Sequence, residues 1–357
     1  MTRSGLERDA RAVVARFLVV VAVVGAGACA ADDSPPTAVA PGAAATVASQ
    51  SAVHGCGKPL PADQPPTIPG TPKGYKQYTV LATGATLAGP QPQKAGPRTF
   101  WVRVPPDYDP SHAYRVVYLG QGCGGSGVAN TSTYQLYKEA SGGTEEAIYV
   151  AIDIPTDGAN QDCYDNRDGP SSQEWEAFEL FHSVVDANYC VDEDQIFVAG
   201  YSTGGWLANM WGCYFAGDGE HPWNGVPGGD AGASPRRFAP RVRLRGQAVV
   251  AGGEPSNNPP CNGPVAAIWI SQAGANPTDE ERAALARVLR MNGCEGSPTA
   301  PWHPEISGAG VCQQYTACPA DYPVVFCQTN DCHADSHQRA IPAFTRFFDE
   351  ATGRAGG

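Results

Sequence analysis

Positive charge is scarce in this sequence of 357 residues. It contains 24 Lys and Arg against 36 Asp and Glu, which gives a formal net charge of −12 and a pI near 5.0. Apart from the first residues, no run of basic side chains occurs. Because nucleic-acid binding requires clustered Lys and Arg that neutralise phosphates, the sequence argues against DNA or RNA as a partner.

The sequence also lacks the cysteine pattern of a zinc site. Its twelve cysteines show no paired Cys-x-x-Cys spacing. In an exported protein so many cysteines indicate disulfides, not a thiol enzyme. The candidate pairs are two that are close in sequence, Cys312 with Cys318 and Cys327 with Cys332, and one across successive strands, Cys123 with Cys163.

The apolar run near the N-terminus, residues 17–28, is too short to span a bilayer permanently. Four Arg residues precede it, so residues 1–29 are expected to be an export signal. The run ends in Ala26-Gly27-Ala28-Cys29, which resembles a bacterial lipobox and makes Cys29 a candidate for lipidation and membrane anchoring. An ordinary signal peptide cleaved near this point is the alternative. Both versions predict an exported protein, either secreted or lipid-anchored at the cell surface.

The segment after this signal, residues 30–55, is small, Pro-rich and nearly free of large apolar side chains. Such a segment cannot bury enough surface to offset its ordering entropy, so a flexible linker is expected. The remaining residues, 56–357, are enough for one large domain and too few for two.

Apolar runs bounded by turn residues recur through this domain. Several are continuous and rich in β-branched residues, as are strands buried on both faces of a parallel sheet. Strands are expected at residues 99–104, 115–120, 147–154, 195–199, 247–251, 265–271 and 323–327, and helices at 172–187, 278–291 and 340–351. The alternation predicts a three-layer α/β sandwich with a mostly parallel central sheet.

A G-x-S-x-G motif occurs as Gly200-Tyr201-Ser202-Thr203-Gly204. In α/β-hydrolases this serine occupies a strained turn between a strand and a helix, where the crowded backbones require both glycines. Here an apolar stretch, residues 196–199, precedes the motif and a helix-capable stretch, 206–214, follows it. Ser202 is therefore the predicted nucleophile, with a glycine-rich turn that has no chemistry as the alternative.

A second glycine-rich turn, residues 120–125, follows the strand expected at 115–120. Such a turn at the carboxyl end of a strand can direct backbone N–H groups at a developing oxyanion. Gly122 and Cys123 are the predicted donors there, together with the N–H of Thr203. A phosphate cradle is the competing interpretation, but no Lys or Ser/Thr pair follows the glycines as a P-loop requires.

The base and the acid follow from chain order, which in this fold runs serine, acid, histidine. Only His333 and His337 lie after the last expected strand and before the closing helix, and His333, nearer the strand, is the predicted base. The first carboxylate after the strand at 265–271 is Asp279, which is also a natural first-turn residue of the next helix. Glu254 is a second candidate, and a triad without an acid is a third, since such a triad keeps some activity.

Together these motifs resemble the polyhydroxybutyrate depolymerase and feruloyl/acetylxylan esterase group of secreted α/β-hydrolases. The resemblance extends over roughly residues 98–350 and includes Gly122-Cys123-Gly124-Gly125, Cys190-Val191-Asp192, the serine motif and the His333 loop. It implies Ser202 as nucleophile and His333 as base. Two positions depart from the group, because Gln121 stands where it has His and Ala273 stands where it has its acid.

The leading hypothesis is an exported serine esterase that hydrolyses carboxylic esters through an acyl-enzyme. The substrate would be a feruloyl or acetyl ester of polysaccharide, a polyester or a small ester, with no metal or organic cofactor. An alternative, suggested by Ala273, is a cell-surface binding protein that kept the fold and lost turnover. A serine peptidase ranks third. An intact serine–histidine contact would favour the enzyme.

Overall fold

The computed structural model describes residues 55–86, 90–124, 147–155, 163–166, 172–217, 221–223, 236–238, 242–253, 261–271, 277–304, 311–329, 333 and 336–352. The predicted export signal and almost all of the predicted linker lie outside these ranges. Within the described residues, no helix is long and apolar enough to cross a membrane.

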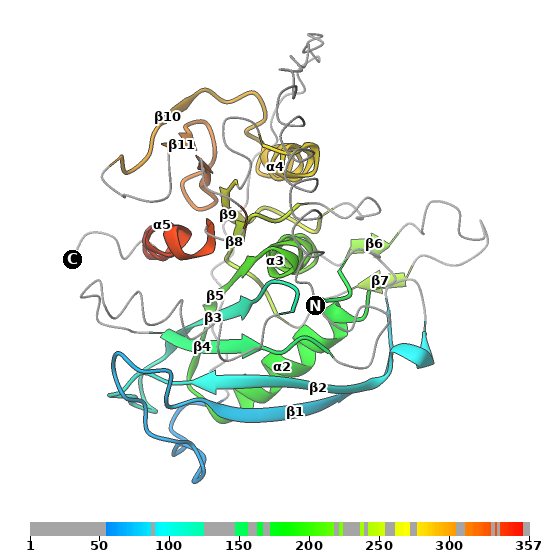
Figure 1. The fold of residues 1–357 in the computed structure, drawn as a ribbon, viewed down its shortest axis with the longest axis vertical. Coiled ribbons are helices and arrows are strands. Elements are labelled where there is room, and N and C mark those ends of the chain that lie inside the picture. The colour runs from blue at the N-terminus through cyan, green and yellow to red at the C-terminus, as the bar shows by residue number, and fades with distance from the viewer. Residues whose placement is uncertain are drawn as a thin grey trace, which may run out of the picture. The chain divides into compact units, whose positions relative to one another are not determined.

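A ten-stranded sheet runs through the described structure in the order β1-β2-β4-β3-β5-β8-β9-β12-β11-β10 (Figure 1). Its six central strands are parallel, whereas the two strands at each edge pair antiparallel. The strands are β1 (Lys76–Ala82), β2 (Gly96–Arg103), β3 (Tyr114–Gly120), β4 (Ala147–Ile152), β5 (Val191–Tyr201), β8 (Gly246–Val250), β9 (Ala266–Ile270), β10 (Thr299–Pro301), β11 (Val311–Tyr315) and β12 (Val324–Gln328). A separate hairpin pairs β6 (His221–Trp223) with β7 (Arg236–Phe238).

Helices cover both faces of this sheet. Helices α2 (Glu174–Asn188), α3 (Thr203–Tyr214) and α4 (Asp279–Met291) share one apolar core with one face, and α5 (Ser336–Ala351) packs on the other (Figure 1). Phe178 of α2 stacks on Trp211 of α3 with ring centroids 4.2 Å apart, and Phe197 of β5 meets Phe348 of α5 at 4.5 Å. A short 3-10 helix, η1 (Pro92–Lys94), precedes β2. This is the predicted three-layer α/β-hydrolase sandwich, and the fold prediction is confirmed.

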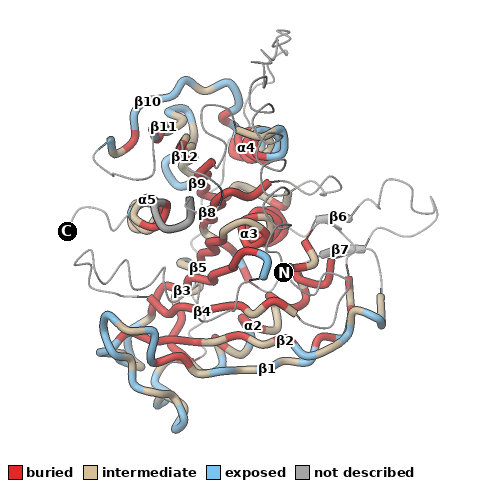
Figure 2. Tube along the Cα trace, in the orientation of Figure 1, coloured by how far each residue is buried: buried red, intermediate tan, exposed pale blue. Residues whose placement is uncertain are grey.

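Local sequence explains why the central elements form. Every residue of β3 is buried, as its continuous apolar run predicts, and Figure 2 shows the central strands buried along most of their length. Helix α4 begins with a capping box, in which the Thr278 hydroxyl accepts from the Glu281 N–H and the Glu281 carboxylate accepts from the Thr278 N–H.

The edge strands β1, β10 and β11 were absent from the sequence-based prediction. Strand β1 alternates between half-buried and exposed residues as far as its last residue, Ala82, which is buried, and most residues of β10 and β11 are half-buried or exposed. Edge strands with one solvated face have no continuous apolar run, so the criterion that found the central strands does not detect them.

Five disulfides link the described residues, and they are Cys56–Cys190, Cys123–Cys163, Cys213–Cys261, Cys294–Cys318 and Cys312–Cys327. The predicted Cys123–Cys163 pair is confirmed. The two predicted local bridges, Cys312 with Cys318 and Cys327 with Cys332, are wrong. Strands β11 and β12 are antiparallel neighbours in a register that sets Cys312 opposite Cys327, which leaves Cys318 to pair with Cys294 after α4.

Candidate active site

Ser202 lies between the last residue of β5 and the first residue of α3, at the carboxyl end of a central strand. Its backbone has φ 56° and ψ −119°, a conformation that a residue with a side chain rarely adopts. The turn is fixed on both sides, since the Ser202 N–H donates to Val250 O at 2.9 Å and the Trp206 N–H donates to Ser202 O at 3.0 Å. The strained strand–turn–helix predicted from the sequence motif is therefore present around Ser202.

Close backbone packing holds the turn after β3 against this elbow. A Cβ on Gly120 would lie 2.9 Å from the Cα of Gly204, closer than real contacts allow, so glycine is required there. The Gly204 N–H donates to Gln121 O at 2.9 Å. The two glycine-rich segments, far apart in sequence, are therefore hydrogen-bonded to each other beside the serine.

The predicted oxyanion donors come together around Ser202. A Cβ on Gly122 would lie 3.3 Å from the Cβ of Ser202, so this part of the turn borders Ser202, and Cys123 follows it directly. Thr203 is the first residue of α3, and N–H groups in the first turn of a helix have no acceptor within the helix. The positive end of the α3 dipole adds to the attraction for a developing negative charge.

His333 contacts Ser202 across a sequence separation of 131 residues. Its Nε2 lies 2.9 Å from the Ser202 Oγ, within the range expected for a base and the hydroxyl it deprotonates. The His333 backbone is also held, because the Tyr201 hydroxyl donates to His333 O at 2.7 Å and the two rings lie 5.0 Å apart. The side chain of His337, the alternative base, lies outside the described residues.

The carboxylates considered as the acid partner of His333, and the buried Glu281 near Asp279 in sequence, differ in their surroundings. Asp279 is the first residue of α4, its side chain is 90% exposed, and its carboxylate pairs with Arg282. In the described part of the chain it makes no contact with Ser202 or His333. Glu254 lies outside the described residues. Glu281 is only 1% exposed, and its carboxylate also accepts from the Ser271 hydroxyl at 3.2 Å, at the carboxyl end of β9. The structure thus brings Ser202 and His333 together and does not bring Asp279 to them.

Comparison with known families bears on the segment that carries this elbow. Residues 94–215 match the model of the family described as "Putative esterase". This segment contains the predicted oxyanion turn and Ser202, so the match supports carboxylic ester hydrolysis as the chemistry of the site.

Solved structures of esterases are similar to the chain at low identity. A thermostable esterase is 12% identical, with 78% of this chain and 61% of the other covered and a TM-score of 0.45. The feruloyl esterase module from Clostridium thermocellum, complexed with sinapinate, is 12% identical over 84% of this chain and 97% of its own, with a TM-score of 0.45. The acetyl xylan esterase from Aspergillus awamori is 12% identical over 77% of this chain and 100% of its own, with a TM-score of 0.43.

The match with the thermostable esterase spans 61% of that protein's length, and the match with a ferulic acid esterase spans 55% of that protein's length. No curated protein sequence matches it.

Three residues that hold the surroundings of Ser202 and His333 were not predicted from the sequence. Tyr201 holds the backbone of His333, and Tyr164 and Asn166 contact the two segments that carry the predicted oxyanion donors. Tyr201 occupies a variable position of the serine motif, so the motif does not mark it. The segment around Tyr164 and Asn166 carries one signal, the predicted pairing of its neighbour Cys163 with Cys123.

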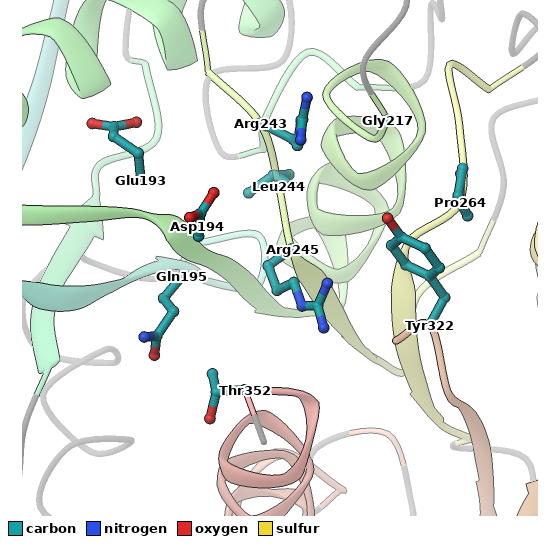
Figure 3. Close-up of a pocket in the computed structure, with 10 residues that line it drawn as sticks. All are labelled: Glu193, Asp194, Gln195, Gly217, Arg243, Leu244, Arg245, Pro264, Tyr322 and Thr352. Atoms are coloured by element: carbon teal, nitrogen blue, oxygen red, sulfur yellow. The ribbon is translucent and has the colours of Figure 1, made fainter. Parts of the chain in front are cut away.

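A cavity of about 270 Å³, whose lining residues Figure 3 shows, includes neither Ser202 nor His333 in its lining. It opens beside the amino ends of β5, β8, β9 and β12, whereas Ser202 is at the carboxyl end of β5. Its lining residues are Glu193, Asp194, Gln195, Gly217, Arg243, Leu244, Arg245, Pro264, Tyr322 and Thr352. Since ligands of open α/β sheets bind at the carboxyl ends of the strands, the ester is not expected to bind there.

No group of three or more His, Cys, Asp or Glu side chains in the described residues is arranged to hold a metal ion. A serine, a histidine and backbone amides in this arrangement can perform nucleophilic acyl transfer.

Proposed function

We propose that the protein is an exported serine esterase that hydrolyses carboxylic esters through an acyl-enzyme on Ser202. The observation that carries the proposal is the 2.9 Å distance between His333 Nε2 and Ser202 Oγ at a strained elbow. This contact favours an enzyme over a binding protein that lost turnover, because a binding protein has no need to keep a base on the serine. The family match over residues 94–215 supports the same chemistry.

In the proposed reaction the Ser202 Oγ attacks the ester carbonyl carbon while His333 accepts its proton. The carbonyl oxygen becomes negative and is stabilised by the N–H of Thr203 and the N–H groups of Gly122 and Cys123. His333 then protonates the departing alkoxide, which leaves as the alcohol. A water molecule that gives a proton to His333 then attacks the acyl carbon. The bond between the acyl carbon and the Ser202 Oγ breaks, His333 returns the proton to this Oγ, and the carboxylic acid is released.

The acid that orients His333 stays a prediction. Asp279 remains the sequence-based candidate with Glu254 as its alternative. The exposed ion pair of Asp279 with Arg282 argues against a direct role in orienting the imidazole. A carboxylate in that role stabilises the imidazolium that forms during attack, and its loss leaves part of the activity.

The proposed substrates are feruloyl or acetyl esters of polysaccharide, or a polyester, as the motif resemblance implies. Export is supported by five disulfides, which persist in oxidising compartments. Cys29 lies outside the described residues. Membrane anchoring through a lipid on Cys29 remains an open proposal beside free secretion, and membrane fractionation of wild type and Cys29→Ala distinguishes the two.

The test uses residues 50–357 produced with disulfide formation allowed. Hydrolysis of p-nitrophenyl acetate and butyrate is followed beside the Ser202→Ala variant, and a serine-reactive phosphonate tests labelling of the nucleophile. We expect turnover and labelling that both disappear in the variant. A well-folded wild type with neither would refute the esterase and favour the binding protein. Methyl ferulate, acetylated xylan, polyhydroxybutyrate and a peptide anilide then separate the substrate classes.

A further inference from the structure

The proposed oxyanion donors belong to two separate parts of the chain. Gly122 and Cys123 follow β3, and Thr203 begins α3. Oxyanion stabilisation depends on donors held in place before the reaction, because donors that must reorganise lose most of their effect. The contacts that hold these two parts in one geometry are therefore expected to support catalysis.

A third segment, residues 163–166, contacts both parts. Cys163 is joined to Cys123 by a disulfide. Tyr164 is buried, and its hydroxyl accepts from the Gln121 N–H at 3.2 Å while it donates to Ile152 O at 2.7 Å. The turn after β3 is thus tied to this segment by one covalent bond and one hydrogen bond.

The other part is held by Asn166, which is fully buried. Its Nδ2 donates to the backbone carbonyl of Thr203 and lies 3.2 Å from the Thr203 Oγ1. A carbonyl oxygen can only accept, so the amide nitrogen must face Thr203 and the orientation of the Asn166 side chain is defined. These contacts fix both the carbonyl and the side chain of the residue whose N–H is a proposed oxyanion donor.

The position of Asn166 is not explained by stability alone. Its Oδ1 is buried without a hydrogen-bond partner among the described residues, which is unfavourable for the folded state. An amide that leaves its oxygen unsatisfied while its nitrogen holds Thr203 is consistent with a constraint imposed by the site.

We propose that residues 163–166 position the oxyanion hole, with the Cys123–Cys163 disulfide and Tyr164 holding the turn after β3 and Asn166 holding Thr203. The proposal rests on the proposed esterase function. These residues do not contact the reacting atoms, so they are positioning residues that act through the N–H groups of Gly122, Cys123 and Thr203.

The test compares three variants with wild type. Asn166→Asp keeps the shape of the side chain and removes the donor to Thr203, Tyr164→Phe removes the hydroxyl, and a double variant, Cys123→Ala with Cys163→Ala, removes the disulfide. The matched control is Cys294→Ala with Cys318→Ala, which removes a disulfide between the end of α4 and the turn after β11. Phosphonate titration counts the active sites in each sample, so that kcat refers to folded enzyme.

We expect kcat for p-nitrophenyl esters to fall by about 10- to 100-fold in the three variants, below the loss for removing an oxyanion donor outright, with KM changed less than about threefold. The rate ratio of an oxygen ester to its thionoester should also fall, because sulfur accepts hydrogen bonds weakly and reports the oxyanion contacts. The control should keep the wild-type kcat and ratio. A wild-type ratio in all three variants would overturn the proposal, since a purely structural role lowers the number of active sites and not this ratio.

Hydrogen–deuterium exchange tests the proposal by a measurement that does not depend on ester hydrolysis. Amides of residues 118–124 and 200–206 should exchange faster in the three variants and at the wild-type rate in the control. Unchanged exchange in all three would refute the positioning role even if the esterase is confirmed. A wild type that hydrolyses no ester would refute the proposed function, and the exchange data would still decide whether residues 163–166 hold these two segments.

Discussion

The Tyr201 hydroxyl offers a test of how far one hydrogen bond outside the reacting atoms supports catalysis. In Tyr201→Phe the ring that packs beside Gly122 and His333 is kept, and only the donor to His333 O at 2.7 Å is lost. His333 would keep its 2.9 Å approach to Ser202 in part of the molecules and move away from it in the rest. The expected result is a lower kcat with little change in KM.

The magnitude follows from the environment of this hydrogen bond. Net contributions of single hydrogen bonds are about 0.5–1.5 kcal/mol, and this one is solvent-exposed, so water can replace the donor and about 0.5–1 kcal/mol applies. If the whole amount is lost from the transition state, kcat falls by about two- to fivefold.

The assay is the steady-state hydrolysis of p-nitrophenyl butyrate, normalised to active sites by phosphonate titration. The matched control is Tyr78→Phe, which removes a tyrosine hydroxyl that lies 2.8 Å from the Tyr189 hydroxyl, away from Ser202. It should lower stability and leave kcat unchanged. A wild-type kcat in Tyr201→Phe would refute the inference that this hydroxyl positions His333. A loss above about 100-fold would mean a direct role in the chemistry.

Three further variants test other parts of the reasoning. Gly122→Ala should lower kcat at least about tenfold, because the added Cβ would lie 2.9 Å from the Tyr201 ring and 3.3 Å from the Ser202 Cβ. Steady-state kinetics measure this change, and a variant with the wild-type kcat would contradict the placement of this turn beside Ser202. Asp279→Asn should change kcat less than about threefold, since the exposed carboxylate pairs with Arg282, whereas a loss near 10⁴-fold in the same assay would assign Asp279 as the acid. His182→Ala should reduce the free energy of unfolding by about 2–3 kcal/mol with no change in kcat. The buried ring bridges the Tyr118 hydroxyl at 3.0 Å and the Glu193 carboxylate at 3.1 Å; urea unfolding measures the loss, and a wild-type midpoint would show that the bridge does not stabilise the fold.

Much of the fold and the centre of the site could be predicted from local patterns. Continuous apolar runs identify the central strands because such strands are buried on both faces. The glycines around Ser202 identify the elbow, because the chain must turn sharply where two backbones meet. Chain order leaves His333 and His337, and closeness to the last strand favours His333, which the structure places 2.9 Å from the Ser202 hydroxyl.

The rest could not be predicted because it depends on which distant residues face each other. The register of β11 and β12 pairs Cys312 with Cys327 and overrides closeness in sequence. The chain path brings Asn166 to Thr203 and Tyr201 to His333, contacts that no sequence spacing encodes. The exposure of Asp279 is likewise a property of how α4 lies on the sheet. Periodicity and turn chemistry are local, so they reveal the central strands, the helices and the turn at Ser202, whereas the side-chain partners across the sheet depend on how distant segments pack together.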